Sequence, residues 1–222
     1  MLIYLSKINP TLDQETINTL LPKISKENQK RCQRFRFKED TLRTLYGELI
    51  VRHVICQQLS YKNEDITILK EDGGKPYIKG RPIHFNVSHA GEYVVSAFSE
   101  HEVGIDIEQM KEIDINIADR FFYQQEYVDL LAQEPSAQFD YFFSLWTLKE
   151  SYIKWLGTGL STPLDSFCFR ITDTGITCTD DKREIMPFFK QYPVCDYKLS
   201  VCSLIKDFPD KVKKITIEEL IL

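Results

Sequence analysis

The sequence has no apolar stretch long enough to cross a membrane and no start typical of a secreted protein. A membrane helix needs about 18 consecutive apolar residues. The segment 1–10 lacks the basic flank and the long apolar run of a secretory signal. No tract is low in complexity, and no internal repeat is legible. We therefore expect a cytoplasmic protein that makes no membrane contact.

Two further absences concern cysteine spacing and basic charge. The six cysteines include no C-x-x-C pair, so neither a zinc site nor a disulfide framework is predicted. We expect reduced thiols, most of them buried. The chain has 28 basic and 33 acidic residues, a formal net charge of −5 at pH 7. This balance argues against general nucleic-acid binding.

What the sequence does have is the composition of a folded protein. With 222 residues, 43% of them hydrophobic and 27% charged, it can bury a substantial core. Apolar residues at helical spacing predict helices over 39–59, 117–131 and 139–156. Apolar runs and alternation predict strands over 65–70, 83–87, 93–98, 103–108, 167–171 and 197–204, and a terminal element over 215–220. We predict an α+β fold whose halves, 1–102 and 103–222, meet near residue 102.

Charge is concentrated in two segments of opposite sign. Residues 23–43 include eight basic side chains and three acids, whereas residues 102–134 include nine acids against Lys111 and Arg120. Such a protein can hold an anion at the first segment and a divalent cation at the second. Two solvated helical faces would give the same pattern, so individual residues must decide.

Asp106 and Glu108 are the first candidate site residues. Apolar residues alternate with them in the predicted strand 103–108, so both carboxylates lie on one face. Two neighbouring carboxylates are tolerated when both face water or when a cation lies between them. The pattern alone leaves both readings open.

The predicted helix 139–156 carries a second constellation. Trp146, Glu150 and Lys154 are spaced at i, i+4 and i+8 and form one stripe. Glu150 and Lys154 can be an ordinary surface ion pair. Alternatively, Glu150 completes a three-carboxylate magnesium site and Lys154 neutralises a phosphate beside it, because Mg²⁺ is commonly shared between carboxylates and substrate phosphates.

The third constellation is Ser88-His89, which follows the predicted strand 83–87. A lone histidine is more often structural than functional. Here the neighbouring serine, the turn Gly74-Lys75-Pro76 and the basic segment favour a position that faces an anion.

Taken in order and spacing, these motifs resemble the signature of the 4′-phosphopantetheinyl transferases, and most of all the surfactin-synthetase-activating type, its long monomeric branch. The motifs are Phe85-Asn-Val-Ser88-His89, Val103-Gly-Ile-Asp106-Ile-Glu108, Arg120-Phe-Phe with Glu126, and Trp146-Thr-Leu-Lys149-Glu150-Ser-Tyr-Ile-Lys154. Further matches are Cys32-Gln-Arg-Phe, Lys38-Glu-Asp, Gly74-Lys-Pro76 and the segment 159–167. The resemblance therefore covers nearly the whole chain.

The resemblance implies a fold and a reaction. It implies a monomer of two similar α+β halves related by a pseudo-twofold axis, with coenzyme A in the cleft between them. In the implied reaction, a serine hydroxyl of an acyl or peptidyl carrier protein attacks the β-phosphorus of coenzyme A. The products are the holo-carrier and 3′,5′-ADP.

The resemblance also implies roles for individual residues. The magnesium ligands, which could equally hold Mn²⁺, would be Asp106, Glu108 and Glu150. The coenzyme A contacts would be Lys154 and Ser88 near its phosphates, His89, Arg31 and Arg43 around its 3′-phosphate, and Lys75 and Pro76 in an adenine-side loop. Glu126 matches an acid near the metal whose role stays open. For the base that takes the proton of the serine, the candidate is Glu150, with Glu126 and Lys154 as rivals.

One position departs from the family pattern. Asn28 stands where close relatives carry a lysine for the nucleotide phosphate. That contact is either lost here or shifted to Lys26 or Lys30.

The resemblance places carrier contacts on the second half, beside the cleft. Lys111 and Arg120 are the cations of the acidic stretch, and Met110, Ile113 and Ile115 offer apolar surface. Alternatively, the two isoleucines only cover the core of the second half.

Two other functions compete with transfer to a carrier. A metal-dependent nucleotide pyrophosphatase would use the same carboxylates to activate water. A non-catalytic carrier-binding module would keep the fold without needing the three acids, whose presence counts against it.

Overall fold

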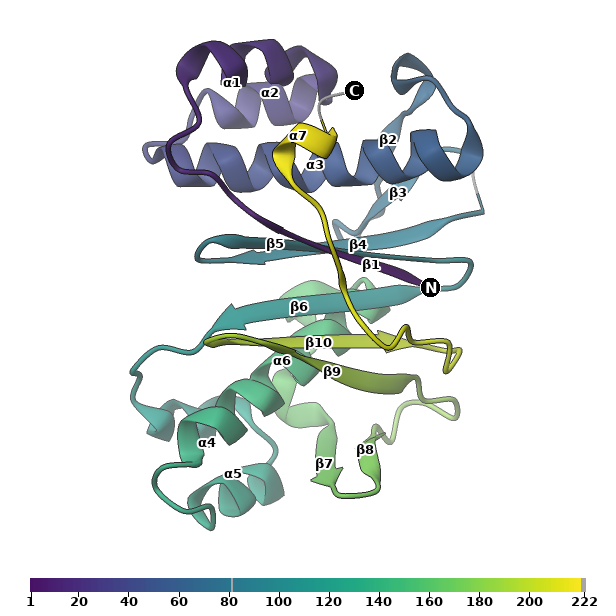
Figure 1. The fold of residues 1–222 in the computed structure, drawn as a ribbon. Helices are drawn as coiled ribbons and strands as arrows, with labels where there is room; N and C mark the ends of the chain where they lie inside the picture. The colour runs from purple at the N-terminus through teal and green to yellow at the C-terminus, as the bar shows by residue number, and fades with distance from the viewer. Residues whose placement is uncertain (81, 221–222) are drawn as a thin grey trace.

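The computed structural model describes residues 1–80 and 82–220 and shows helices on two outer layers with sheets between them (Figure 1). The predicted α+β class is confirmed. The helices are α1 (Gln14–Leu20), α2 (Lys26–Cys32), α3 (Lys38–Leu59), α4 (Ala118–Phe121), α5 (Gln124–Leu131), α6 (Gln138–Leu156) and α7 (Ile217–Leu220). The first strands are β1 (Leu2–Lys7), β2 (Ile68–Lys70), β3 (Pro76–Ile78), β4 (His84–Ala90), β5 (Tyr93–Ser99) and β6 (Val103–Gln109). The later strands are β7 (Cys168–Thr172), β8 (Gly175–Thr179), β9 (Phe188–Val194), β10 (Tyr197–Ser203) and β11 (Lys213–Lys214).

The same succession of elements occurs twice along the chain. A strand, a long helix, a small hairpin and a larger hairpin follow one another as β1, α3, β2–β3 and β4–β5, and again as β6, α6, β7–β8 and β9–β10. The two main sheets have the strand orders β11-β1-β5-β4 and β6-β10-β9, so each repeat places its last strand beside its first. The prediction of two similar α+β halves is confirmed, although the sequence shows no legible repeat.

The sheets lie face to face, with α3 outside the first and α6 outside the second (Figure 1). Strand β5 shows how the sequence allows this arrangement. Val94 and Phe98 belong to the core beneath α3, whereas Val95 and Ala97 belong to the core between the sheets. A strand buried on both faces is apolar at successive positions, which explains the nearly continuous apolar run.

The long helices agree with their predicted bounds, whereas the helical segment 117–131 is interrupted. Phe122 has extended backbone angles (φ −98°, ψ 154°) and separates α4 from α5. Its buried ring packs against Phe142 and Trp146 of α6, with centroids 5.1 and 6.3 Å away. The break in the helix thus coincides with the burial of this aromatic ring.

The end of the chain returns to the first half. β11 pairs in parallel with β1, and α7 packs against α3 (Figure 1). Ile215, Ile217 and Leu220 are buried in the same core as the residues of α3. The predicted boundary near residue 102 stays a prediction. The last segment, 213–220, belongs to the second half by sequence but packs on the first half.

The structure also bears on the cysteines and on membrane contact. All six cysteines lie within the described residues and are free thiols; Cys32, Cys178 and Cys202 are buried, and Cys195 is exposed. Among the described helices, none combines the length and the apolar character needed to cross a membrane.

Candidate functional site

Asp106, Lys154 and Ser88 meet where the two halves join. Lys154 Nζ donates to Asp106 Oδ1 at 2.6 Å and to Ser88 Oγ at 2.8 Å, and Ser88 Oγ donates to the same carboxylate oxygen at 2.8 Å. These residues come from β6, α6 and β4. The structure thus brings together residues that the sequence separates by 66 positions.

Two contacts hold these elements in place. A Cβ atom on Gly104 of β6 would lie 2.0 Å from the carbonyl oxygen of Ser151, so glycine is what lets α6 lie directly on β6. Asn86 of β4 accepts a hydrogen bond from the Ile105 N–H at 3.0 Å. The strand that carries Asp106 is therefore fixed against both the helix that carries Lys154 and the strand that carries Ser88.

The three predicted metal ligands lie in an electrostatically strained group. Asp106 is 2% exposed, and within the described structure its buried Oδ2 has no hydrogen-bond partner. Burial raises the pKa of Asp106, and burial together with the neighbouring Asp106 raises the pKa of Glu108 to about 7. The same two causes raise the pKa of Glu150. Carboxylates in such surroundings are stabilised in the ionised form by an added cation.

No described group of three or more His, Cys, Asp or Glu side chains already has a metal-binding arrangement. The ammonium group of Lys154 supplies the nearest positive charge to Asp106, at 2.6 Å. The chemistry of the residues, three acids with one unpartnered buried oxygen, fits a hard cation that takes oxygen ligands. The ligand set stays a prediction.

A cavity of about 320 Å³ lies beside this group, on the first half. Its lining includes four of the residues predicted to bind coenzyme A, namely Arg31, Arg43, Pro76 and His89. Arg43 Nη1 donates to the Gly91 carbonyl at 2.8 Å, which orients the guanidinium group. The surrounding protein removes part of the hydration of His89, and Arg43, Lys154 and Arg31 face it, so its pKa is lowered. The cavity is therefore suited to an anion.

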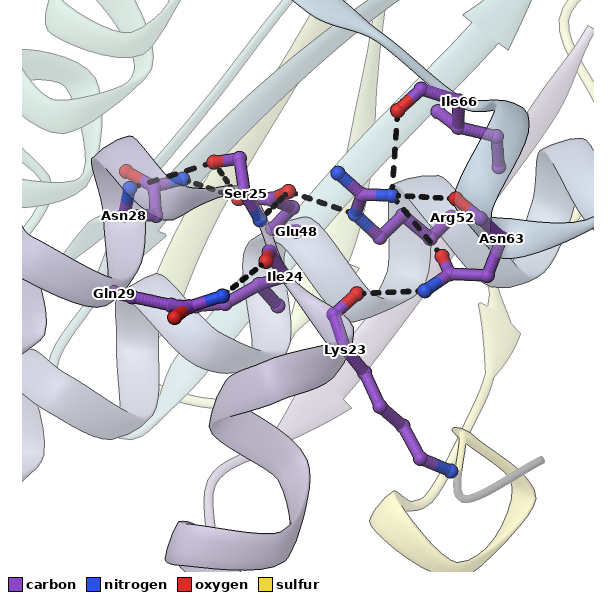
Figure 2. Close-up of polar contacts among 9 residues, drawn as sticks. All are labelled: Lys23, Ile24, Ser25, Asn28, Gln29, Glu48, Arg52, Asn63 and Ile66. Atoms are coloured by element: carbon purple, nitrogen blue, oxygen red, sulfur yellow. Dashed lines mark hydrogen bonds and ion pairs between the residues drawn. The ribbon is translucent and has the colours of Figure 1, made fainter.

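A polar network that the sequence reasoning missed lies beside this cavity, which is lined by its members Ser25, Asn28 and Glu48. Figure 2 shows the hydrogen bonds of this network. Glu48 of α3 accepts hydrogen bonds from Ser25 Oγ (2.8 Å), Asn28 Nδ2 (2.6 Å) and Arg52 Nε (2.7 Å). Ser25 is the N-cap of α2, so the carboxylate fastens this helix to α3. The i, i+4 spacing of Glu48 and Arg52 inside an apolar stripe was the available signal.

This network also contains Asn28, the residue that departs from the family pattern. The amide of Asn28 lines the cavity but is held by Glu48 (Figure 2). Lys26 and Lys30 are exposed, and neither belongs to the cavity lining. The structure therefore places neither of these two lysines in the wall of the cavity.

Lys75 is not brought to the cavity, although its neighbours Gly74 and Pro76 are. Its side chain is 8% exposed and forms an ion pair with Glu102. Its ammonium group also donates to the Trp155 carbonyl oxygen at 2.9 Å. Its ammonium group is therefore occupied by contacts between the halves, and the contact of Lys75 with coenzyme A stays a prediction.

Glu126 lies in the core of the second half. Its Oε2 is 2.7 Å from Lys149 Nζ, and both side chains are fully buried. It also accepts hydrogen bonds from the backbone N–H groups of Tyr123 (2.8 Å) and Phe169 (2.6 Å). The structure does not bring Glu126 to Asp106 and Lys154, because its oxygens are occupied by these partners.

The surface predicted to bind a carrier is partly apolar. Met110 and Ile113 pack against the core of the second half, and Ile115 is half-buried. This packing supports, for Ile113, the alternative in which the isoleucines cover the core. Lys111 and Arg120 are exposed, and Phe121, which the sequence reasoning missed, is 45% exposed beside Trp146.

Comparison with known proteins finds sequence matches that span nearly the whole chain. Residues 8–101 match the family model described as 4′-phosphopantetheinyl transferase, N-terminal, and residues 102–202 match that of the 4′-phosphopantetheinyl transferase superfamily. The 4′-phosphopantetheinyl transferase Sfp of Bacillus subtilis (strain 168) is 42% identical over 224 residues, which covers 100% of both chains. The 4′-phosphopantetheinyl transferase gsp of Aneurinibacillus migulanus is 38% identical over 216 residues, 96% of this chain and 91% of its own. A solved holo-[acyl-carrier-protein] synthase of Thermotoga maritima aligns with a TM-score of 0.40 and 18% identity, over 46% of this chain and 61% of that one.

Proposed function

The chain belongs to the 4′-phosphopantetheinyl transferase superfamily, and from this premise we propose that it modifies carrier proteins. It transfers the 4′-phosphopantetheine group of coenzyme A to a serine of an acyl or peptidyl carrier protein and releases 3′,5′-ADP. One observation carries the proposal. His89 lines the cationic cavity, and the preceding residue of β4, Ser88, contacts Asp106 and Lys154. A single strand thus connects a nucleotide-sized anion site with the acidic group.

We propose Mg²⁺ or Mn²⁺ as the cofactor, held by Asp106, Glu108 and Glu150. The unpartnered Oδ2 of Asp106 and the raised pKa values of the three carboxyl groups support a cation at this place. When bound, the ion would supply positive charge to the pyrophosphate as negative charge develops on the leaving group.

The remaining steps belong to side chains of the chain itself. Arg31, Arg43 and His89 bind the nucleotide phosphate, and Lys154 donates to oxygens of the pyrophosphate. Glu150 accepts the proton of the carrier serine, because its carboxylate belongs to the acidic group at which the pyrophosphate reacts. Glu126 takes no part, since its oxygens are occupied in the buried core.

We further propose that the protein works as a cytoplasmic monomer. The site draws its residues from both halves of one chain, so a second copy is not needed to complete it. Size-exclusion chromatography with light scattering tests this, and a stable dimer would contradict it.

Intact-mass spectrometry tests the proposed reaction. The chain, coenzyme A and Mg²⁺ are incubated with a panel of apo-carriers, and each carrier should gain one phosphopantetheine group. Release of 3′,5′-ADP without any carrier would instead indicate a pyrophosphatase. Carrier binding without a mass gain would indicate a binding module.

The same assay tests the metal. Activity should vanish in excess EDTA and return with Mg²⁺ or Mn²⁺. Asp106→Asn and Glu150→Gln should each lose at least about 100-fold in rate, as expected when a charge-stabilising group is removed from a transition state. The matched control is Glu112→Gln, an exposed acid of the same segment. Undiminished activity in EDTA would contradict the metal's role.

A further inference from the structure

The loop between β2 and β3 is joined to the end of α6 through a buried lysine. Lys75 Nζ donates to the Trp155 carbonyl oxygen at 2.9 Å and pairs with Glu102 through Oε2. The other oxygen of Glu102 lies 2.8 Å from His84 Nδ1. A charged amine that is only 8% exposed is costly unless it is paired, and here the carboxylate and the helix carbonyl both compensate it.

Backbone packing at the same place confirms how close the loop and the helix are. A Cβ atom on Gly73 would lie 1.8 Å from the carbonyl oxygen of Gly157, the residue that ends α6 with a φ of 73°. Only a residue without a side chain fits at this point of the loop. The loop therefore rests directly on the C-terminus of α6.

This junction lies between the two parts of the site. Gly74 and Pro76, on either side of Lys75, line the cavity. Trp155, whose carbonyl receives the Lys75 hydrogen bond, directly follows Lys154. The position of α6 on β6 is fixed separately, by the close contact at Gly104. The Lys75 contacts fix something else, namely the position of the cavity wall relative to α6.

We propose that the Lys75 side chain is a positioning group, which holds the nucleotide cavity of the first half in register with Lys154 and the acidic group of the second half, and that its ammonium group does not itself touch coenzyme A. The inference rests on the proposed transfer reaction. The nucleotide is held in the cavity while its pyrophosphate reacts at the acidic group, so both must keep a fixed separation. A misplacement of about 1 Å between reacting groups can cost about 100-fold in rate.

The alternative hypothesis is that the Lys75 ammonium group binds coenzyme A directly. A substitution of its ion-pair partner Glu102 distinguishes the two hypotheses. If Lys75 binds the nucleotide, Glu102→Gln frees its amine and should tighten binding, whereas Lys75→Met weakens it. If Lys75 is a positioning residue, both substitutions break the same contact between the loop and α6, and both lower kcat.

The experiment measures kcat and KM for coenzyme A with an apo-carrier, and the Kd for 3′,5′-ADP by calorimetry. In both Lys75→Met and Glu102→Gln we expect kcat to fall about 10-fold or more while the Kd stays within about threefold, because Arg31, Arg43 and His89 are untouched. Lys75→Arg, which keeps the charge, should recover part of kcat. Lys79→Met, an exposed lysine of the same hairpin, is the matched control and should equal the parent.

Hydrogen exchange gives a readout that does not depend on activity. In Lys75→Met, exchange in 71–76 and 153–158 should accelerate together, while thermal melting confirms that the variant is folded. A Kd at least 10-fold weaker in Lys75→Met with an unchanged or tighter Kd in Glu102→Gln would overturn the inference. Parental kcat and exchange in both variants would also overturn it. Failure of the proposed function is distinguishable, because the parent itself would then modify no carrier.

Discussion

The buried ion pair between Glu126 and Lys149 allows a direct test of whether Glu126 acts in the reaction or in the fold. Their charged atoms are 2.7 Å apart, both side chains are fully buried, and Lys149 Nζ also donates to the carbonyls of Leu164 (2.7 Å) and Phe167 (2.9 Å). Glu126→Gln keeps the shape but leaves the ammonium group without its counter-charge. Breaking a buried pair in this way costs about 3–5 kcal/mol, and for a chain of this size we expect Tm to fall by roughly 6–20 °C.

The pH dependence of the variant follows from Lys149. Burial lowers the pKa of Lys149, and Glu126 opposes that shift. Without the carboxylate, the folded state releases the Lys149 proton at a lower pH than the unfolded state, whose pKa is near the ordinary value of 10.5. The unfolded state then binds more protons, so the free energy of unfolding of the variant rises with pH between these two pKa values. The slope is up to about 1.4 kcal/mol per pH unit, and it extends to lower pH than in the parent, where Glu126 keeps the Lys149 pKa higher.

Thermal unfolding at about pH 7 and about pH 9 measures both effects. Carrier modification at a temperature where the variant is folded should keep kcat within about threefold of the parent, because within the described structure the polar partners of Glu126 are Lys149 and the backbone N–H groups of Tyr123 and Phe169. Glu134→Gln, an exposed acid nearby in the sequence, is the control. An unchanged Tm with a rate about 100-fold lower would refute a structural role and show that Glu126 acts in catalysis.

Three further predictions concern the substrates. Arg31→Ala and Arg43→Ala should raise KM for coenzyme A more than they lower kcat, because a remote phosphate gives uniform binding; variants that still discriminate against 3′-dephospho-coenzyme A as strongly as the parent would contradict this. The pKa of His89 is lowered below its ordinary 6.5, so a bound phosphate, which raises it, should cause proton uptake that is largest between the free and bound pKa values and falls as pH rises above the bound one. Calorimetry in buffers of different ionisation enthalpy should find less uptake in His89→Gln, and equal uptake would exclude this residue. Met110→Asp and Lys111→Glu should raise KM for the carrier and leave KM for coenzyme A nearly unchanged; equal effects on both would place the carrier elsewhere.

Local pattern was enough to predict the elements that carry the site. The stripe of α6 with Gly157 at its end and the alternation of β6 each record a constraint that acts between neighbours in the sequence. That Asp106, Lys154 and Ser88 belong to one site was predicted from the family resemblance of the motifs, and the structure places their side chains in contact. What a motif does not record is which charged residue becomes buried.

Lys75 and Glu126 show this limit. Both belong to matched motifs, yet their partners decide their roles, and the Lys75 partner Trp155 is 80 positions away. The pairing of β1 with β11 escaped prediction for the same reason, because a contact between Tyr4 and Lys213 leaves no periodic signal in either segment. Glu48 was different: its charge inside an apolar stripe was visible, and a buried charge demands partners.

The return of the last segment to the first half bears on how the protein folds as it is synthesised. The first half leaves the ribosome early, but β1 lacks its neighbour β11, and the core under α3 stays open where Ile217 and Leu220 will lie. This apolar seam closes only when residues 213–220 emerge. Completion of the cavity-bearing half therefore waits until residues 213–220 have been synthesised, and until then the first half leaves this apolar seam uncovered.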